Sequence, residues 1–323
     1  MKLALDMALN KHINKFIHTV EPKDDGITGH ITTVESEQEK AFIDKLMQND
    51  LFQEMNVFFT KHAQGEAFGL VEIMAGTTDT NRDERVPKKA HNDLSYFCQQ
   101  INLDSYIRYD KLDSFNAEGN FIEVFENYFQ KHLLNNALLV GFNGVGRNGT
   151  SDPEVFPLAQ DVQKGFLQKI RENAQTTGKN NVVDVGKVGE SGQYKTLHKL
   201  IKEALTRIEP IYSGYGLVAI CGREIIGDNL IAQEDSKHPK FITRLQKTLG
   251  GVPVVSLPYF PENAILLTRL ENLSLYVHRH NIRRGFLNQP GKDYLAHYFS
   301  WCVDFVVENY NACALLENIK LEE

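Results

Sequence analysis

The chain has 323 residues, of which 42% are hydrophobic and 24% charged, proportions that are ordinary for a globular protein and leave room for two domains. Its formal net charge of −7 argues against a protein that grips nucleic acid by neutralising phosphates, although an acidic chain can still enclose DNA. No apolar run reaches the roughly 18 residues that a membrane span needs. The cysteines have neither paired nor zinc-ligand spacing, so we expect them to be reduced and buried.

The first sixty residues predict two helices joined by a linker. Residues 1–20 carry a partly amphipathic pattern, and residues 21–33 are polar and rich in Gly, Asp and Thr. Ser36 and Glu39 then fit a capping box, which satisfies free amides at a helix start. The apolar spacing that follows predicts a helix that runs to about Thr60.

An extended hairpin is predicted next. Residues 65–74 and 94–109 have the composition and alternation of strands, and the polar segment between them carries mixed charge at its tip. A two-stranded hairpin cannot bury both faces on its own body, so a neighbouring subunit is its natural partner. The alternative is a solvated loop with a charged tip.

A single long helix is predicted over residues 120–140, with an apolar stripe along one side. At about 1.5 Å per residue it spans roughly 30 Å. Gly141 stands where a left-handed C-cap residue is expected, and Gly144 and Gly146 follow in the run GFNGVGRNG. We interpret these glycines as a helix stop and a tight loop between two domains.

The remaining chain alternates helices and strands without an internal repeat, so we expect an α+β fold. Predicted helices cover residues 159–173, 194–208 and 241–249. Predicted strands cover residues 216–221, 252–257, 264–277, 294–307 and 312–319.

The glycines also match G-x-G-x-x-G at Gly144, Gly146 and Gly149, the pattern of a dinucleotide-binding loop. That loop works only after a strand and at a helix start, where amides meet a pyrophosphate. Here it follows a predicted helix, and the residues up to Pro157 do not open another. We therefore reject dinucleotide binding as the main interpretation and keep a nucleotide-binding cytosolic enzyme as a distant alternative.

Other chemical patterns are weak. His278 and His280 would share one face of a strand, but no suitable third metal ligand is evident nearby. No nucleophile elbow, P-loop or similar signature occurs, so we predict no catalytic residue, metal or cofactor. Arg283 and Arg284 follow that strand; they form either a solvated turn or a basic turn that pairs with acidic groups of neighbouring subunits.

Six stretches stand out in chain order. They are TTDT at 77–80, QINLDSYIRYDKLD at 100–113, GFNGVGRNGTSD at 141–152, LAQDVQKGFLQKIRENA at 158–174, VPVVSLPYFPENAILLTRLENLSLY at 252–276 and VDFVVENYNACALLENIKL at 303–321. Together they resemble the major capsid proteins of P2-like temperate myophages, from about Thr33 onward. Each stretch alone is a weak signal, but six in order are highly specific, whereas the first 30 residues match poorly.

The resemblance implies the tailed-phage major capsid fold that is named after phage Hong Kong 97. The expected parts are an N-terminal arm (33–64), an extended loop over the next subunit (65–93), a peripheral domain with a long spine helix (94–157 and 264–311) and an axial domain around each capsomer centre (158–263 and 312–323).

The resemblance also implies that residues 1–32 are a prosequence, which is removed by a phage protease that is fused to a scaffold or acts with one. The cut is expected within residues 29–34, between Thr32 and Thr33. From the residues alone, the linker is accessible, as proteolysis requires.

The implied function is a structural protein that assembles into hexamers and pentamers of an icosahedral phage head around double-stranded DNA, without sequence-specific binding. Its implied partners are itself, the scaffold and maturation protease, and the portal protein; no membrane is involved. It would assemble in the bacterial host cytoplasm and end in the virion. An encapsulin-like shell around an enzyme cargo is the alternative with the same fold.

Two sets of residues are expected to matter for assembly. Contacts between subunits are predicted at Arg82, Arg85, Lys88, Lys89, Arg283 and Arg284. Hinge points between the two domains are predicted at Gly141, Gly144 and Gly146.

Overall fold

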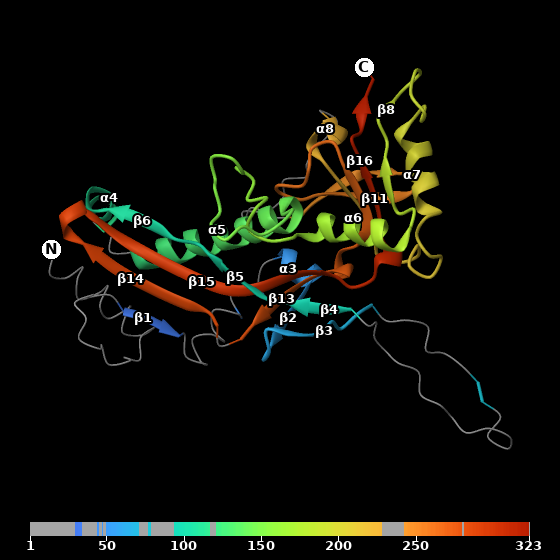
Figure 1. Ribbon diagram of the computed structural model, residues 1–323. Coiled ribbons are helices and arrows are strands. Elements are labelled where there is room, and N and C mark those ends of the chain that lie inside the picture. The colour runs from blue at the N-terminus through green and yellow to red at the C-terminus, as the bar shows by residue number, and fades with distance from the viewer. Residues whose placement is uncertain are drawn as a thin grey trace.

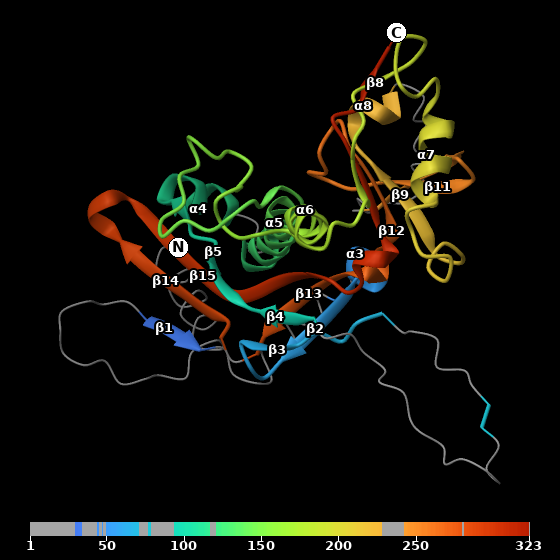
Figure 2. The same ribbon diagram turned by 45° about the vertical axis from the view of Figure 1, so that its right-hand side comes forward.

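The computed structural model of the chain describes residues 30–33, 44, 47, 50–70, 77–78, 94–116, 121–227, 242–279 and 281–322. Within them two β-sheets lie at an angle to each other, and a long helix runs along the first (Figures 1 and 2). The mixture of helices and strands confirms the α+β class.

The first sheet has seven strands built around one long strand, β15. Its members are β1 (His30–Thr33), β2 (Asn56–Thr60), β5 (Gln99–Asn102), β6 (Ser105–Arg108), β13 (Leu273–His278), β14 (Arg283–Gln289) and β15 (Tyr294–Val307). β15 pairs with β14 and β13 on one edge and with β6 and β5 on the other. β1 extends the sheet beyond β14, and β2 extends it beyond β13. The strand predicted over residues 294–307 is confirmed.

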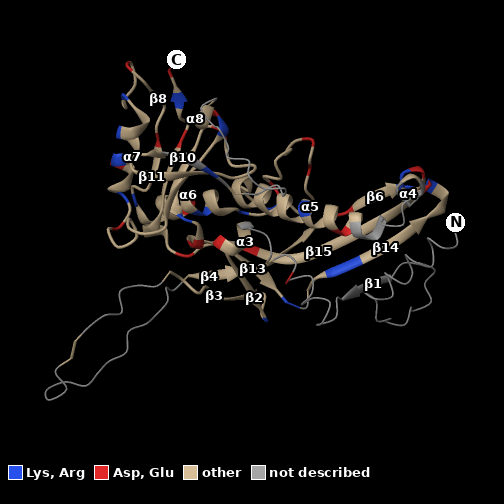
Figure 3. Ribbon diagram, turned by 180° about the vertical axis from the view of Figure 1, so that it is seen from behind, with Lys and Arg blue, Asp and Glu red and all other residues tan. Residues whose placement is uncertain are grey.

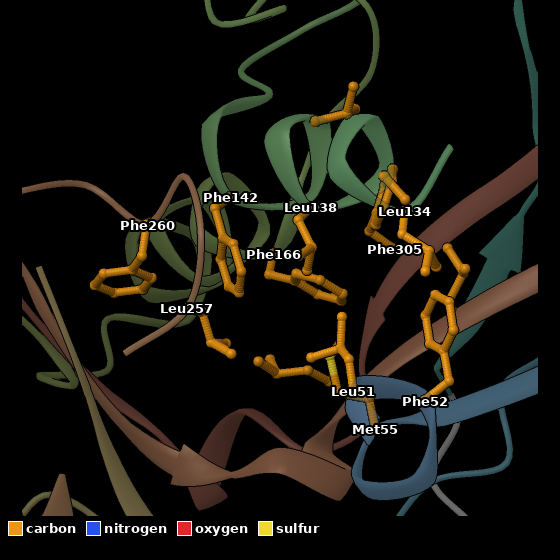
Figure 4. Packing of buried hydrophobic residues seen from close by; sticks show 14 of the residues in the cluster. Leu51, Phe52, Met55, Leu134, Leu138, Phe142, Phe166, Leu257, Phe260 and Phe305 are labelled. Carbon is orange, nitrogen blue, oxygen red and sulfur yellow. The ribbon is translucent and has the colours of Figure 1, made fainter. Parts of the chain in front are cut away.

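The long helix α5 (Phe121–Asn143) packs its apolar stripe onto this sheet. Phe129, Leu133, Ala137 and Leu138 of the predicted stripe are buried in one cluster with alternate residues of β15, namely Trp301, Val303, Phe305 and Val307. Burying a large apolar side chain contributes about 1.5–3 kcal/mol relative to leaving it exposed, so this stripe holds the helix in place. Figure 4 shows the same core from close by, where α3 (Asp50–Glu54) adds Leu51 and Phe52, and Met55 follows directly after the helix.

The second sheet has six strands in the order β10-β11-β9-β12-β16-β7. Their bounds are β7 (Val182–Asp184), β9 (Leu217–Cys221), β10 (Thr243–Leu249), β11 (Val252–Ser256), β12 (Ile265–Arg269) and β16 (Ala314–Glu317). Helix α7 (Leu197–Leu205) buries Leu200, Ile201 and Ala204 in the apolar cluster of this sheet, and its Thr196 N-cap accepts a hydrogen bond from the Lys199 amide. The predicted strands over residues 216–221 and 252–257 are confirmed.

Shorter elements complete the described chain. They are α4 (Tyr109–Asn116), α6 (Phe166–Thr177), α8 (Arg223–Ile226), the paired β3 (Gln64–Glu66) and β4 (Ser95–Phe97), the paired β8 (Lys187–Val188) and β17 (Lys320–Leu321), and the 3-10 turns η2 (Leu270–Asn272), η3 (Pro290–Lys292) and η4 (Tyr310–Ala312).

The chain crosses between the sheets at η2 and again at η4, and one buried side chain links the two crossings. The Asn272 amide nitrogen donates to the Asn309 carbonyl oxygen at 3.0 Å, and the Asn272 amide oxygen accepts from the Asn309 backbone N–H at 2.8 Å. Asn272 is fully buried, so both bonds are protected from water. The Asn272 side chain therefore joins the two crossings at the junction between the sheets.

Two segments predicted as helix are strands. Residues 56–60 form β2, which pairs in parallel with β13, and residues 243–249 form β10, which pairs with β11. Over so few residues the apolar spacing fits either period, and the neighbouring strand decides. Helix α3 ends at Glu54, and the Ser36 capping box lies outside the described residues.

Two predicted strands are divided. The segment 94–109 becomes β4, β5 and β6, and Tyr109 begins the unpredicted helix α4. The segment 264–277 breaks at η2, so that β12 joins the second sheet and β13 the first. The expected domain boundary at residue 264 therefore does not coincide with the boundary between the sheets. The helices predicted over 159–173 and 194–208 begin later, at Phe166 and Leu197.

Candidate assembly surfaces

The structure describes the root of the segment that is expected to form the extended loop. β3 and β4 pair in antiparallel fashion from Gln64 opposite Phe97 to Glu66 opposite Ser95. Phe68 and Phe97 are 64% and 55% exposed. Aromatic side chains left in solvent at a loop root are typical of a surface that a second molecule covers. The basic residues expected at the loop tip, Arg82, Arg85, Lys88 and Lys89, lie outside the described residues.

Arg283 and Arg284 begin strand β14, so their interpretation as a turn is wrong. Arg283 lies opposite Ser300 of β15, and Arg284 lies opposite Phe299. Because side chains alternate along a strand, Arg283 is exposed and Arg284 is buried. Figure 3 shows the two residues as a blue band on β14. Arg283 thus remains available to a neighbouring subunit, whereas Arg284 is engaged within its own chain.

The Arg284 guanidinium is held by a carboxylate and an imidazole. It pairs with Glu126 of α5, with nitrogen–oxygen distances of 3.0 and 2.8 Å, and its Nε donates to His297 Nε2 at 2.8 Å. It also lies 4.8 Å from the centre of the Phe129 ring, within cation–π range. This cluster connects α5 to the β14–β15 hairpin through a buried charge pair.

His297 is neutral in this cluster. Burial, with the positive charge of Arg284 acting in the same direction, lowers its pKa from 6.5 to about 3. The geometry agrees, because the Nε2 atom that accepts from Arg284 cannot also carry a proton.

Two of the three glycines at the end of α5 lie at a close-packed contact. α5 continues through Gly141 without a left-handed residue, so the predicted C-cap there is wrong. A Cβ atom on Gly141 would lie 3.1 Å from the Phe166 and Phe305 rings, and one on Gly144 would lie 1.9 Å from the Gln163 carbonyl oxygen. Gly146 faces open space. The absence of side chains at Gly141 and Gly144 lets the segment before α6 lie directly on the end of α5.

Thr32 and Thr33 lie in β1, at the edge of the first sheet. Thr32 is opposite Arg284 and Thr33 opposite Arg283 in an antiparallel register. The segment expected as an open linker therefore ends in a paired strand. β1 is bonded to β14 along one side, and a strand at a sheet edge separates from its neighbour more easily than a central one.

Neither the glycine-rich loop from Gly144 nor His278 forms part of a small-molecule site among the described residues. The loop from Gly144 follows a helix, and the next helix begins only at Phe166, so the strand–turn–helix geometry of a dinucleotide site is missing there. His278 Nε2 lies 3.1 Å from the Lys61 carbonyl oxygen, and His280 lies outside the described residues. Among the described residues, no three His, Cys, Asp or Glu side chains are grouped to hold a metal ion.

Two further observations concern the cysteines and the described helices. All four cysteines are buried and unpaired, as predicted; burial raises the pKa of the Cys98 and Cys221 thiols to about 12. Among the helices that the structure describes, none is long and apolar enough to cross a membrane.

Sequence reasoning missed two buried carboxylates at the end of β15. Asp304 is 4% exposed and Glu308 is fully buried, and both lie beside the root of the extended loop. A signal was present, since an acidic residue inside the apolar run VDFVVEN must find a partner if that run is buried.

Comparisons with known proteins agree with this architecture. The family model described as phage major capsid protein, P2 family, matches residues 10–319. The chain is 34% identical to the capsid proteins of Escherichia phage P2 over 90% of its length and 87% of theirs, and 26% identical to the major capsid protein of Serratia phage KSP20 over 84% of each. A chain of the satellite phage P4 procapsid, solved with its size determination protein, superposes with a TM-score of 0.75 at 34% identity, covering 87% of this chain and 99% of that one.

The family match over residues 10–319 includes every strand of both sheets and helix α5. An identity of 34% over 90% of the chain supports a shared function as well as a shared fold. The chain therefore belongs to the P2 family of phage major capsid proteins, which form the shell of the virion head.

Proposed function

We propose that this chain forms hexamers and pentamers that close into an icosahedral head around double-stranded DNA. The observation that supports this most directly is the superposition on nearly the whole of a procapsid chain at 34% identity. Association then rests on many modest contacts repeated by symmetry, so that no single contact needs to be strong.

Each region of the chain has a proposed place in the shell. The second sheet, with its helix α7, forms the axial part at the capsomer centre, and the first sheet with α5 forms the peripheral part. The extended loop reaches the neighbouring subunit, with Arg82, Arg85, Lys88 and Lys89 at its tip and the exposed Phe68 and Phe97 at its root. Arg283 adds a charged contact on the β14 edge.

We also propose that residues 1–32 are removed during maturation, by a protease that works with a scaffold. Thr32 and Thr33 are paired with β14, so β1 must leave the sheet before the bond between them enters a protease cleft. Because β1 pairs along one side alone, releasing it costs less free energy than opening a central strand.

Further partners are a portal protein and the packaged DNA, which the acidic chain encloses without reading its sequence. The role is structural, with no catalysis by the chain itself.

The test is to express the chain with its candidate scaffold and protease and to examine the high-mass fraction by electron microscopy and mass spectrometry. Closed shells whose subunit is trimmed after Thr32 are expected. Shells with an intact subunit would keep the capsid function and remove the cleavage, and shells filled with a protein cargo would favour the encapsulin alternative. A persistent small oligomer, with the scaffold folded and present, would contradict the capsid function; a nucleotide-induced rise in melting temperature would then support the enzyme alternative.

A further inference from the structure

The extended loop leaves the body of the protein through a root that has little strand pairing of its own. β3 and β4 share a three-residue register with one further backbone hydrogen bond at each end, from Ala67 N–H to Leu94 and from Cys98 N–H to Ala63, and an isolated pair of strands this short is marginally stable in water. Yet a loop that contacts a neighbouring subunit must leave its own subunit in a defined direction. Something other than the β3–β4 pairing must therefore hold the root.

Two buried carboxylates at the end of β15 bind both ends of the root. Asp304 Oδ2 accepts from the Phe97 backbone N–H at 2.9 Å, on the returning strand. Glu308 Oε2 accepts from the Gly69 backbone N–H at 2.6 Å, on the outgoing segment. Hydrogen bonds to ionised acceptors are stronger than neutral ones, and both carboxylates are shielded from water. Each end of the loop root is thus fixed either to β15 or to the residue that directly follows it.

Tyr276 of β13 completes the attachment of the outgoing segment. Its hydroxyl donates to Glu308 Oε1 at 3.0 Å and accepts from the Phe68 backbone N–H at 2.7 Å. Its ring stacks on Tyr96 with centroids 4.6 Å apart, so one side chain contacts both sides of the root. The Gly69 φ of +75° is in the left-handed region, which glycine adopts without strain at the point where its amide meets Glu308.

Asp304 also connects the root to helix α6. Its second oxygen, Oδ1, lies 2.7 Å from Lys169 Nζ and accepts from Gln163 Nε2 at 3.2 Å. Lys169 is in the first turn of α6, and Gln163 is in the segment that packs on Gly144 at the end of the spine helix. A single carboxylate therefore joins the loop root to α6 and to the segment that leads into it.

We propose that Asp304 and Glu308 are positioning residues for the extended loop. They set the direction in which the loop leaves the subunit, and Asp304 makes that direction depend on α6 through Lys169. The inference rests on the proposed function in one respect, namely that the loop contacts a neighbouring subunit. Its structural part concerns the single chain and is testable without assembly.

The first test is hydrogen exchange at single-residue resolution on the full-length chain, each variant being compared with the unmodified protein in the same oligomeric state. Glu308→Gln is expected to speed exchange of the Gly69 and Phe68 amides about tenfold and to leave Phe97 unchanged; Asp304→Asn is expected to do the reverse. This reciprocal pattern is not what general destabilisation produces, because that would speed exchange throughout the first sheet. Equal acceleration everywhere, or no change at either end of the root, would overturn the proposal.

A matched pair of variants on α6 tests the connection through Lys169. Lys169→Met is expected to speed exchange at Phe97, and Lys169→Arg to restore it. Arg171→Met removes another cation from the same helix, one that pairs with Glu317 of β16, and is expected to leave Phe97 unchanged. Equal effects of the two methionine variants at Phe97 would overturn the connection.

The second test measures assembly of the same variants as the fraction of subunits in closed shells. Asp304→Asn and Lys169→Met are expected to lower that fraction several-fold relative to Arg171→Met. Normal shells from an Asp304→Asn variant with loosened root amides would overturn the positioning role. Failure of the unmodified chain to form shells would count against the proposed function, while the exchange pattern would still stand as the result for the loop root.

Discussion

Arg284 is buried whereas its neighbour Arg283 is exposed, so the two arginines cannot be interpreted as one basic turn. Its guanidinium and the Glu126 carboxylate are 6% and 14% exposed, so removing one partner leaves the other charged and shielded from water. We expect Arg284→Met to lower the free energy of unfolding by about 3–5 kcal/mol in urea titrations. Arg283→Met, on the adjacent exposed residue, is expected to change it by less than about 0.5 kcal/mol. Equal losses would show that the ion pair is not the cause.

His297 predicts a specific response to acid. Its pKa is about 3 in the folded chain, against an ordinary value of 6.5, so between these pH values the unfolded chain binds a proton that the folded chain does not. Stability from this residue is therefore complete above pH 6.5 and is lost as the pH falls toward 3, by up to about 1.4 kcal/mol per pH unit.

The matching variant is His297→Gln, which keeps an acceptor for Arg284 and cannot titrate. Urea midpoints measured from pH 7 to pH 4 should fall less steeply for this variant than for the unmodified chain. Carboxylates titrate in both proteins, so the difference between the two slopes isolates the histidine. Identical slopes would contradict the buried neutral imidazole.

At the scale of elements, the glycines at the end of α5 have two interpretations: close-packed positions or hinges. A Cβ on Gly144 would overlap the Gln163 carbonyl oxygen, whereas Gly146 has open space around it. If close packing is the reason for glycine, Gly144→Ala should cost about 1–3 kcal/mol of unfolding free energy and Gly146→Ala should be neutral or slightly stabilising. If these positions are hinges, both variants should also slow expansion of the precursor shell. Electron microscopy of shells before and after expansion, together with urea titration of the subunit, measures the two effects separately.

At the scale of the whole molecule, the proposed contacts of Arg82 and Arg85 with a neighbouring subunit predict a salt dependence of shell stability. Reversing the charge at Arg82 and Arg85 should weaken shells more in low salt than in high salt, because ion pairs between subunits are already screened at high ionic strength. Shell dissociation followed by light scattering across a salt series provides the measurement. An effect that is the same at every salt concentration would indicate that these side chains are only solvated.

The sequence by itself determined those elements whose pattern is long or strongly apolar. The apolar stripe from Ile122 to Leu138 identified helix α5, because about four turns of consistent spacing at 3.6 residues per turn leave no competing period. The strand over residues 294–307 and the strand predicted over residues 216–221 were identified because their sequences are long or strongly apolar. The ordered stretches that resemble P2-like capsid proteins identified the family before any side chain was placed.

Only the tertiary structure decided the short and the polar features. Residues 56–60 and 243–249 became strands because β13 and β11 offered backbone partners, which local spacing cannot reveal. Arg284 and Asp304 were buried because residues more than a hundred positions away, Glu126 and Lys169, supplied the opposite charge. A buried charge is tolerated only where its partner is already in place, and that placement is a property of the packed chain rather than of any segment of it.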